Sequence, residues 1–154
     1  MSKKLSEKEL AAKVVSKMLE HDEFSRWLGI EVLEIKPGYS KIRMTVRKEM
    51  LNGFHICHGG ITFSFADSAL AFASNNYGRV AVALETSIAF PVPVHKGDIL
   101  TAVAEEQSRG NSVGIYNVTV TNQSGIKVGI FRGTVYRTKK DFFPENKSQW
   151  KEAK

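Results

Sequence analysis

The residues best suited to chemistry lie in residues 52–76, which read NGFHICHGGITFSFADSALAFASNN. A loop with two histidines and a cysteine leads into Gly59-Gly60, and the residues that follow are apolar on nearly every face of the helix that they predict. Asp67 lies inside this helix. Burying an ionised carboxylate without partners costs several kcal/mol or shifts its pKa until it is neutral. Asp67 is therefore predicted to be either paired or functional.

Gly59 and Gly60 stand where the loop enters the helix, at a point where backbone N–H groups are free and the helix dipole is positive. Such a terminus can hold an oxyanion formed when a carbonyl is attacked. Asp67 lies two turns, or ~12 Å, further along the helix, which is too far for both residues to touch one carbon atom. We therefore expect a site shared across a two-fold axis, with Gly59 from one subunit and Asp67 from the other.

Three other residues of the loop, His55, Cys57 and His58, resemble metal ligands. No second ligand cluster accompanies them, so no metal site is predicted. Cys57 has no evident orienting acid and is interpreted as a small buried cysteine rather than a nucleophile. His58 is expected to shape the loop through hydrogen bonds rather than to exchange protons.

The surrounding sequence predicts an α+β domain. Ser6 and Glu9 form a capping-box pattern before a helix over residues 7–20, and Phe24, Trp27 and Leu28 indicate a short further turn. Strands are predicted over residues 30–35, 40–46, 81–90, 99–108, 113–121 and 127–137. Short turns between them favour an antiparallel meander of about six strands, curled around a central helix over residues 60–76. The predicted division is a helical extension at 1–28, a domain at 29–138 and a charged tail at 139–154.

Composition restricts the class of protein. The 154 residues fit one domain, and the net charge of +6 comes mostly from residues 1–20 (+2) and 137–154 (+3), which favours solvated termini over a nucleic-acid surface. No apolar run approaches the ~20 residues needed to cross a bilayer, and no membrane or nucleic-acid partner is expected. The absence of a signal-peptide pattern and the single cysteine suit a reducing compartment, so a cytoplasmic location is predicted.

Several short motifs together resemble the phenylacetic acid degradation branch of the hotdog-fold acyl-CoA thioesterases, within the 4-hydroxybenzoyl-CoA thioesterase superfamily. The matching residues, within roughly residues 29–137, are Asn52, His58-Gly59-Gly60, Ala66-Asp67, Phe90-Pro91, Gly97-Asp98, Leu100 and Phe131-Arg132-Gly133. The resemblance implies a helix wrapped in a sheet, a homodimer that pairs its sheets and commonly a homotetramer formed as a dimer of dimers.

The resemblance also implies roles for individual residues. Gly59 would supply the oxyanion amide, and Asp67 would activate water or attack as nucleophile. Asn52 and His58 would orient the thioester and the water. Some relatives carry a serine or threonine where this chain has Ala83, which cannot hold water. Ser68 and Thr86 are the candidates to replace it.

Further residues are candidates for binding the substrate. Gly60 and Ser68 lie beside the predicted catalytic residues, while Arg109 and Arg132, with Lys96 behind them, could meet the phosphates of coenzyme A. The acyl group would contact aromatic side chains, for which the candidates are Phe63, Phe65, Phe90 and Trp27.

The sequence thus predicts hydrolysis of an aryl or medium-chain acyl-CoA to the free acid and coenzyme A, without a metal or cofactor. Two alternatives stay open at this point. A hotdog hydratase or dehydratase would remove a proton from carbon, and a non-catalytic acyl-CoA-binding domain would keep the pocket without the chemistry.

Overall fold

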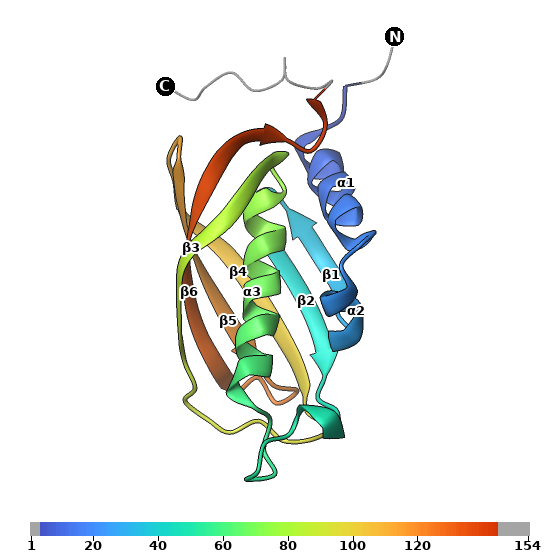
Figure 1. Cartoon of the computed structure of the whole chain (residues 1–154), viewed down its shortest axis with the longest axis vertical. Helices are drawn as coiled ribbons and strands as arrows, with labels where there is room; N and C mark the ends of the chain where they lie inside the picture. Colours follow the sequence, from blue (N-terminus) through green and yellow to red (C-terminus); the bar gives the residue numbers. More distant parts are fainter. Residues whose placement is uncertain (1–3, 145–154) are drawn as a thin grey trace.

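A computed structural model describes residues 4–144 of the chain. Three α-helices, one short 3-10 helix and six strands follow one another in this part of the chain (Figure 1). In chain order they are α1 (Glu7–Leu19), α2 (Glu23–Leu28), β1 (Glu31–Lys36), β2 (Tyr39–Thr45), η1 (Lys48–Met50), α3 (Gly59–Asn75), β3 (Arg79–Ala89), β4 (Ile99–Arg109), β5 (Val113–Thr121) and β6 (Lys127–Asp141). None of the helices in the described part is long and apolar enough to cross a membrane.

The strands form one antiparallel sheet that curves around α3, which is the predicted hotdog arrangement (Figure 1). Helix α3 packs against all six strands, and its buried side chains Phe65, Leu70 and Phe72 fill the concave face of the sheet. Each such side chain contributes roughly 1.5–3 kcal/mol through burial. The opposite face of α3 is not covered by the sheet, and Asp67 lies there among half-buried residues.

The strand order is β1-β2-β4-β5-β6-β3, so the simple meander predicted from the turns is wrong. Strand β3 follows α3 but pairs with β6 at the far edge, and residues 90–98 then cross back to β4 beside β2. Pairing between segments this distant in sequence leaves no local signal. Strand β3 is consequently an edge strand with one row of backbone groups unpaired in this chain.

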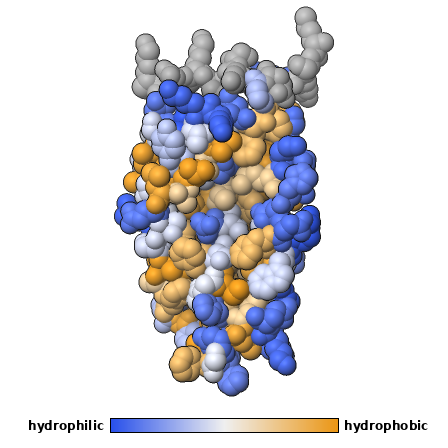
Figure 2. Space-filling view, viewed as in Figure 1, coloured by the Kyte–Doolittle hydropathy of each residue, from blue (hydrophilic) through white to orange (hydrophobic). Residues whose placement is uncertain are grey.

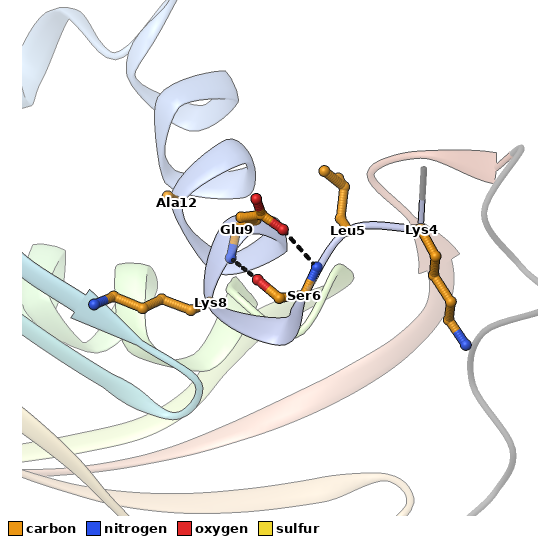
Figure 3. Close-up of a pocket in the computed structure, with 6 residues that line it drawn as sticks. All are labelled: Lys4, Leu5, Ser6, Lys8, Glu9 and Ala12. Carbon is orange, nitrogen blue, oxygen red and sulfur yellow. Dashed lines mark hydrogen bonds between the residues drawn. The ribbon is translucent and has the colours of Figure 1, made fainter. Parts of the chain in front are cut away.

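The N-terminal helices form as predicted. Ser6 Oγ accepts from Glu9 N at 3.2 Å, and Ser6 N donates to Glu9 Oε2 at 2.7 Å, which completes the capping box (Figure 3). Leu10, Ala11, Val14 and Val15 form the buried stripe of α1. A shallow surface hollow lies at this end of α1, among residues 4–12 (Figure 3), and the start of α3 lies at the opposite end of the fold (Figure 1).

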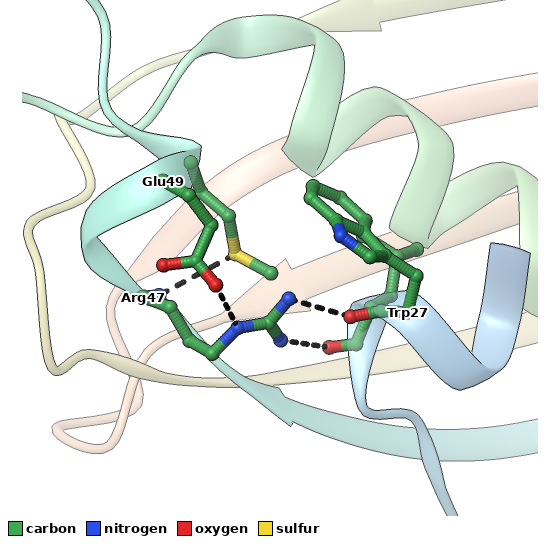
Figure 4. Close-up of polar contacts among 5 residues, drawn as sticks. Trp27, Arg47 and Glu49 are labelled. Atoms are coloured by element: carbon green, nitrogen blue, oxygen red, sulfur yellow. Dashed lines mark hydrogen bonds and ion pairs between the residues drawn. The ribbon is translucent and has the colours of Figure 1, made fainter.

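Arg47 fixes α2 to the segment that leads toward residues 52–58. Its guanidinium donates to Trp27 O at 2.6 Å and Leu28 O at 3.2 Å, and it pairs with Glu49 at 2.7 Å (Figure 4). These bonds satisfy carbonyl groups at the C-terminus of α2. The Arg47 guanidinium also lies over the Trp27 ring, at 5.2 Å from its centroid. Trp27 is thus held against Arg47 and does not line the cavity beside Gly59 in the same chain, so its predicted contact with the acyl group stays a prediction.

The last strand is longer than predicted. It runs to Asp141 instead of ending at residue 137, so residues 139–141 of the predicted tail belong to the sheet. The extension is held because Thr138 Oγ1 donates to Val80 O at 2.7 Å and Arg79 Nε donates to Thr138 O at 2.8 Å. The rest of that predicted tail, from residue 145, lies outside the described residues.

Candidate active site at the start of the central helix

His58 is the N-cap residue of α3. Its Nδ1 accepts a hydrogen bond from Gly60 N at 2.9 Å, so this ring nitrogen acts as an acceptor and the neutral ring carries its proton on Nε2. The predicted role of His58 in shaping the loop agrees with this geometry. The same bond occupies the Gly60 amide, which was predicted to contact substrate.

The amide of Gly59 is the free donor at this helix end. As the first residue of α3 it has no acceptor four residues earlier, and no group among residues 4–144 accepts a hydrogen bond from its N–H. The Phe90 ring lies against Gly59, and a Cβ at this position would approach Phe90 Cζ to 3.1 Å. Because glycine has no Cβ, the Phe90 ring can lie close to the free Gly59 amide.

Asn52 is oriented by the loop that it begins. Its Oδ1 accepts from Phe54 N at 2.9 Å and from Ile56 N at 3.4 Å. With the oxygen so engaged, the side-chain amide presents Nδ2 as its remaining polar group, and Nδ2 can only donate. Asn52 and Gly59 both line one cavity, so two hydrogen-bond donors of the predicted site are brought together.

The cavity has a volume of about 270 Å³ and a mostly apolar wall. Phe90 is a predicted member of this wall. Most other members were not predicted, because the sequence around a single apolar residue in a loop or strand does not indicate whether its side chain faces a ligand. The complete lining is Asn52, Ile56, Cys57, Gly59, Thr62, Phe90, Val92, Pro93, Val94 and Val128.

Cys57 contributes bulk to this wall rather than reactivity. It is 6% exposed, and burial raises the pKa of its thiol, which disfavours the thiolate. No group of three potential metal ligands occurs among residues 4–144.

Asp67 is the unpaired acid of α3. Burial raises the pKa of its carboxyl group, and no hydrogen-bonding or ionic partner from the described residues offsets this effect. A raised pKa makes a carboxylate a stronger base, as general-base catalysis near neutral pH requires. Ser68 is half-buried on the same side of α3.

Other predicted residues lie elsewhere. Phe65 is fully buried in the core and cannot contact an acyl group, while Phe63 packs on Phe131 with 5.5 Å between ring centroids. Arg132 is an exposed residue of β6 that alternates with the inward-facing Phe131 and Gly133, so it lies on the outer face of the sheet. Arg109 stacks on Tyr77, beyond the C-terminal end of α3.

Comparison with known proteins identifies the family. The sequence model described as "Thioesterase superfamily" matches residues 54–128, a range that includes Gly59, Asp67 and Phe90. The chain belongs to this superfamily. It is 41% identical over 120 residues to the acyl-coenzyme A thioesterase PaaI of Escherichia coli, covering 78% of this chain and 86% of that protein.

Two further matches agree with this membership. A putative esterase of Archaeoglobus fulgidus is 40% identical over 136 residues, which cover 88% of each chain. The solved structure of E. coli PaaI, from the phenylacetic acid degradation operon, superposes with a TM-score of 0.87 at 38% identity, covering 88% of this chain and 99% of that one. The hotdog fold read from the sequence is thereby confirmed.

Proposed function

We propose that this protein is an acyl-CoA thioesterase that hydrolyses an aryl or medium-chain acyl-CoA to the free acid and coenzyme A. The observation that carries the proposal is the half-buried, unpartnered Asp67 on a helix whose first amide, at Gly59, is free. The relatives named as thioesterase and esterases support the same reaction class. Phenylacetyl-CoA is the first substrate to test, because the E. coli relative belongs to a phenylacetic acid degradation operon.

The donors at the helix end would bind the thioester carbonyl. Asn52 and Gly59 both line the cavity, so Asn52 Nδ2 and the Gly59 N–H would donate to the carbonyl oxygen, and the positive end of the α3 dipole favours the negative charge that develops on it. His58 Nε2–H remains available to orient the water or the carbonyl. The apolar wall with Phe90 and Val94 would hold the acyl group and exclude competing water.

The carboxylate would start the reaction. As general base, Asp67 accepts a proton while water oxygen bonds to the carbonyl carbon, and the resulting oxyanion is held by the Gly59 amide. Collapse of this intermediate breaks the carbon–sulfur bond, and the leaving thiolate takes the proton. As nucleophile, Asp67 would instead form an anhydride that water then hydrolyses. Sulfur donates weakly into the carbonyl, so neither path needs a metal or a cofactor beyond the coenzyme A of the substrate.

The site would be completed by a second copy of the chain. Eight residues of helix separate Gly59 from Asp67, or ~12 Å, so the two residues of one chain cannot act on one carbon. The edge strand β3 offers unpaired backbone groups and the exposed apolar side chains Val82 and Leu84 for pairing about a two-fold axis. Hydrophobic patches mark the face that carries α3 and β3 (Figure 2). We propose a homodimer as the active unit, with a homotetramer formed from two such dimers.

The cytoplasm is the proposed compartment, because the only cysteine, Cys57, is a buried free thiol and forms no disulfide within the chain.

Replacing Asp67 by Asn tests the proposal directly. We expect Asp67→Asn to lower kcat by ~10²–10⁴, the usual contribution of a general base, while the folded dimer is retained. Ser64→Ala, which removes an exposed hydroxyl that donates to Gly60 O on the same helix, is the matched control and should retain activity. Thiol release from a panel of aryl and alkyl acyl-CoA esters is the assay. Wild-type turnover in Asp67→Asn contradicts the assignment, and loss of enoyl absorbance without thiol release would indicate a hydratase instead.

The two roles of Asp67 can be separated by one further measurement. Single-turnover hydrolysis in ¹⁸O-labelled water places label in the protein when Asp67 is the nucleophile and only in the acid product when it is the base.

A further inference from the structure

Three arginines gather at the end of the sheet beyond the C-terminus of α3. Arg79 begins β3, Arg109 ends β4 and Arg137 lies near the end of β6. The Arg109 guanidinium lies 3.8 Å from the centroid of the Tyr77 ring, and Arg137 Nη1 donates to Gly110 O at 2.7 Å. Of these three, only Arg109 was predicted from the sequence to meet the phosphates of coenzyme A. Arg79 and Arg137 lie 30 and 28 residues from it, so no local pattern indicates the group.

Arg79 serves the structure of this end. Its Nε and Nη2 donate to Thr138 O at 2.8 Å and Arg137 O at 3.0 Å, and Nη1 and Nη2 also reach Asn111. All three of its nitrogens are therefore engaged. Arg79 holds the ends of β3 and β6 against the β4–β5 turn.

Arg109 and Arg137 keep donors free. Within residues 4–144, the one ion pair of this group joins Arg109 Nε to Glu106 Oε1 at a long 3.8 Å, and Glu106 Oε2 also accepts from Tyr116 Oη at 3.0 Å. Apart from the bond to Gly110, no hydrogen bond from the two guanidinium groups is made to described residues. Burial, with the nearby charges of Arg79 and Arg109, lowers the pKa of Arg137. The positive charges of these neighbouring arginines repel one another, and a bound anion would reduce this repulsion.

Arg109 stacks on Tyr77, just beyond the C-terminal end of the helix that carries Asp67. Helix α3 continues for eight residues from Asp67 to Asn75, or ~12 Å, and Tyr77 beneath Arg109 follows directly. The side chains on the uncovered face of α3 over this interval, Ser68 and Ala71, are small and half-buried. An extended chain with a thioester at Asp67 can therefore lie along the helix with its other end at the arginines.

We propose that Arg109 and Arg137 bind a phosphate group of the coenzyme A whose thioester is attacked at Asp67 of the same chain. This inference rests on the proposed function. Guanidinium groups bind phosphate oxygens through paired, charge-assisted hydrogen bonds, and the stacking of Arg109 on Tyr77 orients its donors in advance. Arg79 is a positioning residue that holds the strand ends on which the two binding residues stand.

Two substrates separate phosphate binding from chemistry. An acyl-CoA carries the phosphates, whereas the same acyl group on N-acetylcysteamine retains the thioester and lacks them. We expect Arg109→Gln and Arg137→Gln each to raise KM for the acyl-CoA by about 10-fold or more. The kcat for acyl-CoA and kcat/KM for the N-acetylcysteamine ester should stay close to wild type.

The control variant is Arg43→Gln, which removes an arginine paired with Glu31 on the β1–β2 side of the sheet and should change neither substrate. Inhibition by adenosine 3′,5′-bisphosphate, weakened in the two variants and not in Arg43→Gln, would show that the nucleotide end of coenzyme A occupies the site. Equal inhibition of wild type by inorganic phosphate at the same concentration would show a general anion site and overturn the assignment to coenzyme A.

An unchanged KM for acyl-CoA in both variants overturns the inference, as does an equal loss with both substrates, which indicates a purely structural role. Should the wild type hydrolyse neither ester, the proposed function fails separately. Calorimetric binding of coenzyme A to the same variants then decides the phosphate site, and unaltered affinity in Arg109→Gln and Arg137→Gln rejects it.

Discussion

At the scale of single residues, Asp67 combines an unfavourable position for folding with the proposed role of a base. Its carboxyl group is half-buried, its pKa is raised by that burial, and the described chain supplies no partner. A residue that weakens the fold and is placed beside an uncovered helix face is typical of an active site. The folding penalty and the greater basicity of the carboxylate come from the same desolvation.

The pH dependence of stability should report this penalty. The folded pKa of Asp67 lies above its unfolded value of 3.8, so the folded state binds the proton more tightly and stability falls as pH rises from the unfolded pKa through the folded one. Asp67→Asn removes the charge, and we expect its Tm to exceed that of wild type at pH 7. The difference should vanish at pH 3, where the wild-type carboxyl group is protonated in both states. Differential scanning calorimetry across this range measures both, and a lower Tm for Asp67→Asn at pH 7 would show that the carboxylate is stabilised in the folded protein.

The backbone N–H of Gly59 can be removed by substitution with proline, and no side-chain contact is lost because glycine has no side chain. Proline is accepted at the first position of a helix, and His58, at φ −60° and ψ 132°, has the conformation that precedes proline. We expect Gly59→Pro to fold and to lose about 10²–10³ in kcat, the usual cost of one oxyanion donor. Because the proline ring also displaces Phe90, Phe90→Ala serves as the control for that displacement in the same steady-state assay. A kcat for Gly59→Pro equal to that of Phe90→Ala would mean that the amide does not bind the oxyanion.

Asp67, Gly59, Asn52 and His58 could be singled out as candidates from the sequence, because an acid in an apolar helix and a glycine pair at a helix start are local patterns; their catalytic roles stay predictions. Sequence reasoning did not locate Val94 or Val128, which line the cavity from distant strands and loops. It also placed Arg132 near substrate, although strand alternation puts this side chain on the outer face of the sheet.

At the scale of elements, α3 is fastened to the sheet at its C-terminal end by one side chain. Asn76 Nδ2 donates to Lys36 O at 2.7 Å and Tyr39 O at 3.2 Å, and its Oδ1 accepts from Gly38 N at 3.0 Å. Asn76 is 1% exposed, so water could not reach its three backbone partners to replace the hydrogen bonds that the side chain makes. The β1–β2 turn and the end of α3 are thereby joined.

Truncating this residue should loosen the joint. Asn76→Ala leaves one N–H and two carbonyl groups unpaired in a buried place, and we expect it to lower the free energy of unfolding by about 3 kcal/mol. Asn122→Ala, in a more exposed turn where the side chain bonds Ser124 N and Ile126 N, should cost less than half as much. Urea denaturation of both variants provides the comparison, and equal midpoints would indicate that the β1–β2 turn does not depend on Asn76.

The elements themselves were largely predictable, because the capping box of α1 and the alternation in β5 are local. Strand β5 was predicted with the observed bounds, Val113–Thr121. The order of the strands was not predictable, since the pairing of β3 with β6 joins residues 41 to 62 positions apart, from Ala89–Ile130 to Arg79–Asp141. The extension of β6 to Asp141 was missed for the same reason, as its support comes from Arg79 and Val80.

At the scale of the whole molecule, the proposed site shared between two copies of the chain predicts that two inactive variants can restore each other's activity. A dimer of one Asp67→Asn chain and one Gly59→Pro chain has one site in which both residues are intact and one in which both are altered. Co-expression at equal levels forms such mixed dimers in half of the population, and we expect about a quarter of wild-type activity to return. Separately purified variants, mixed without exchange, are the control. Absence of activity in verified mixed dimers would contradict a site built from Gly59 of one chain and Asp67 of the other.

The segment that crosses from β3 to β4, residues 90–98, is a part of the fold in which changes of length could alter which acyl groups the protein accepts. It supplies the ring of Phe90 and the side chains of Val92 and Val94 to the cavity, yet it pairs with no strand of the sheet. Insertions or deletions here would deepen or shorten the cavity beside Gly59 while the register of every strand is unchanged. Divergence among descendants of this enzyme should therefore concentrate in the length of this one connection.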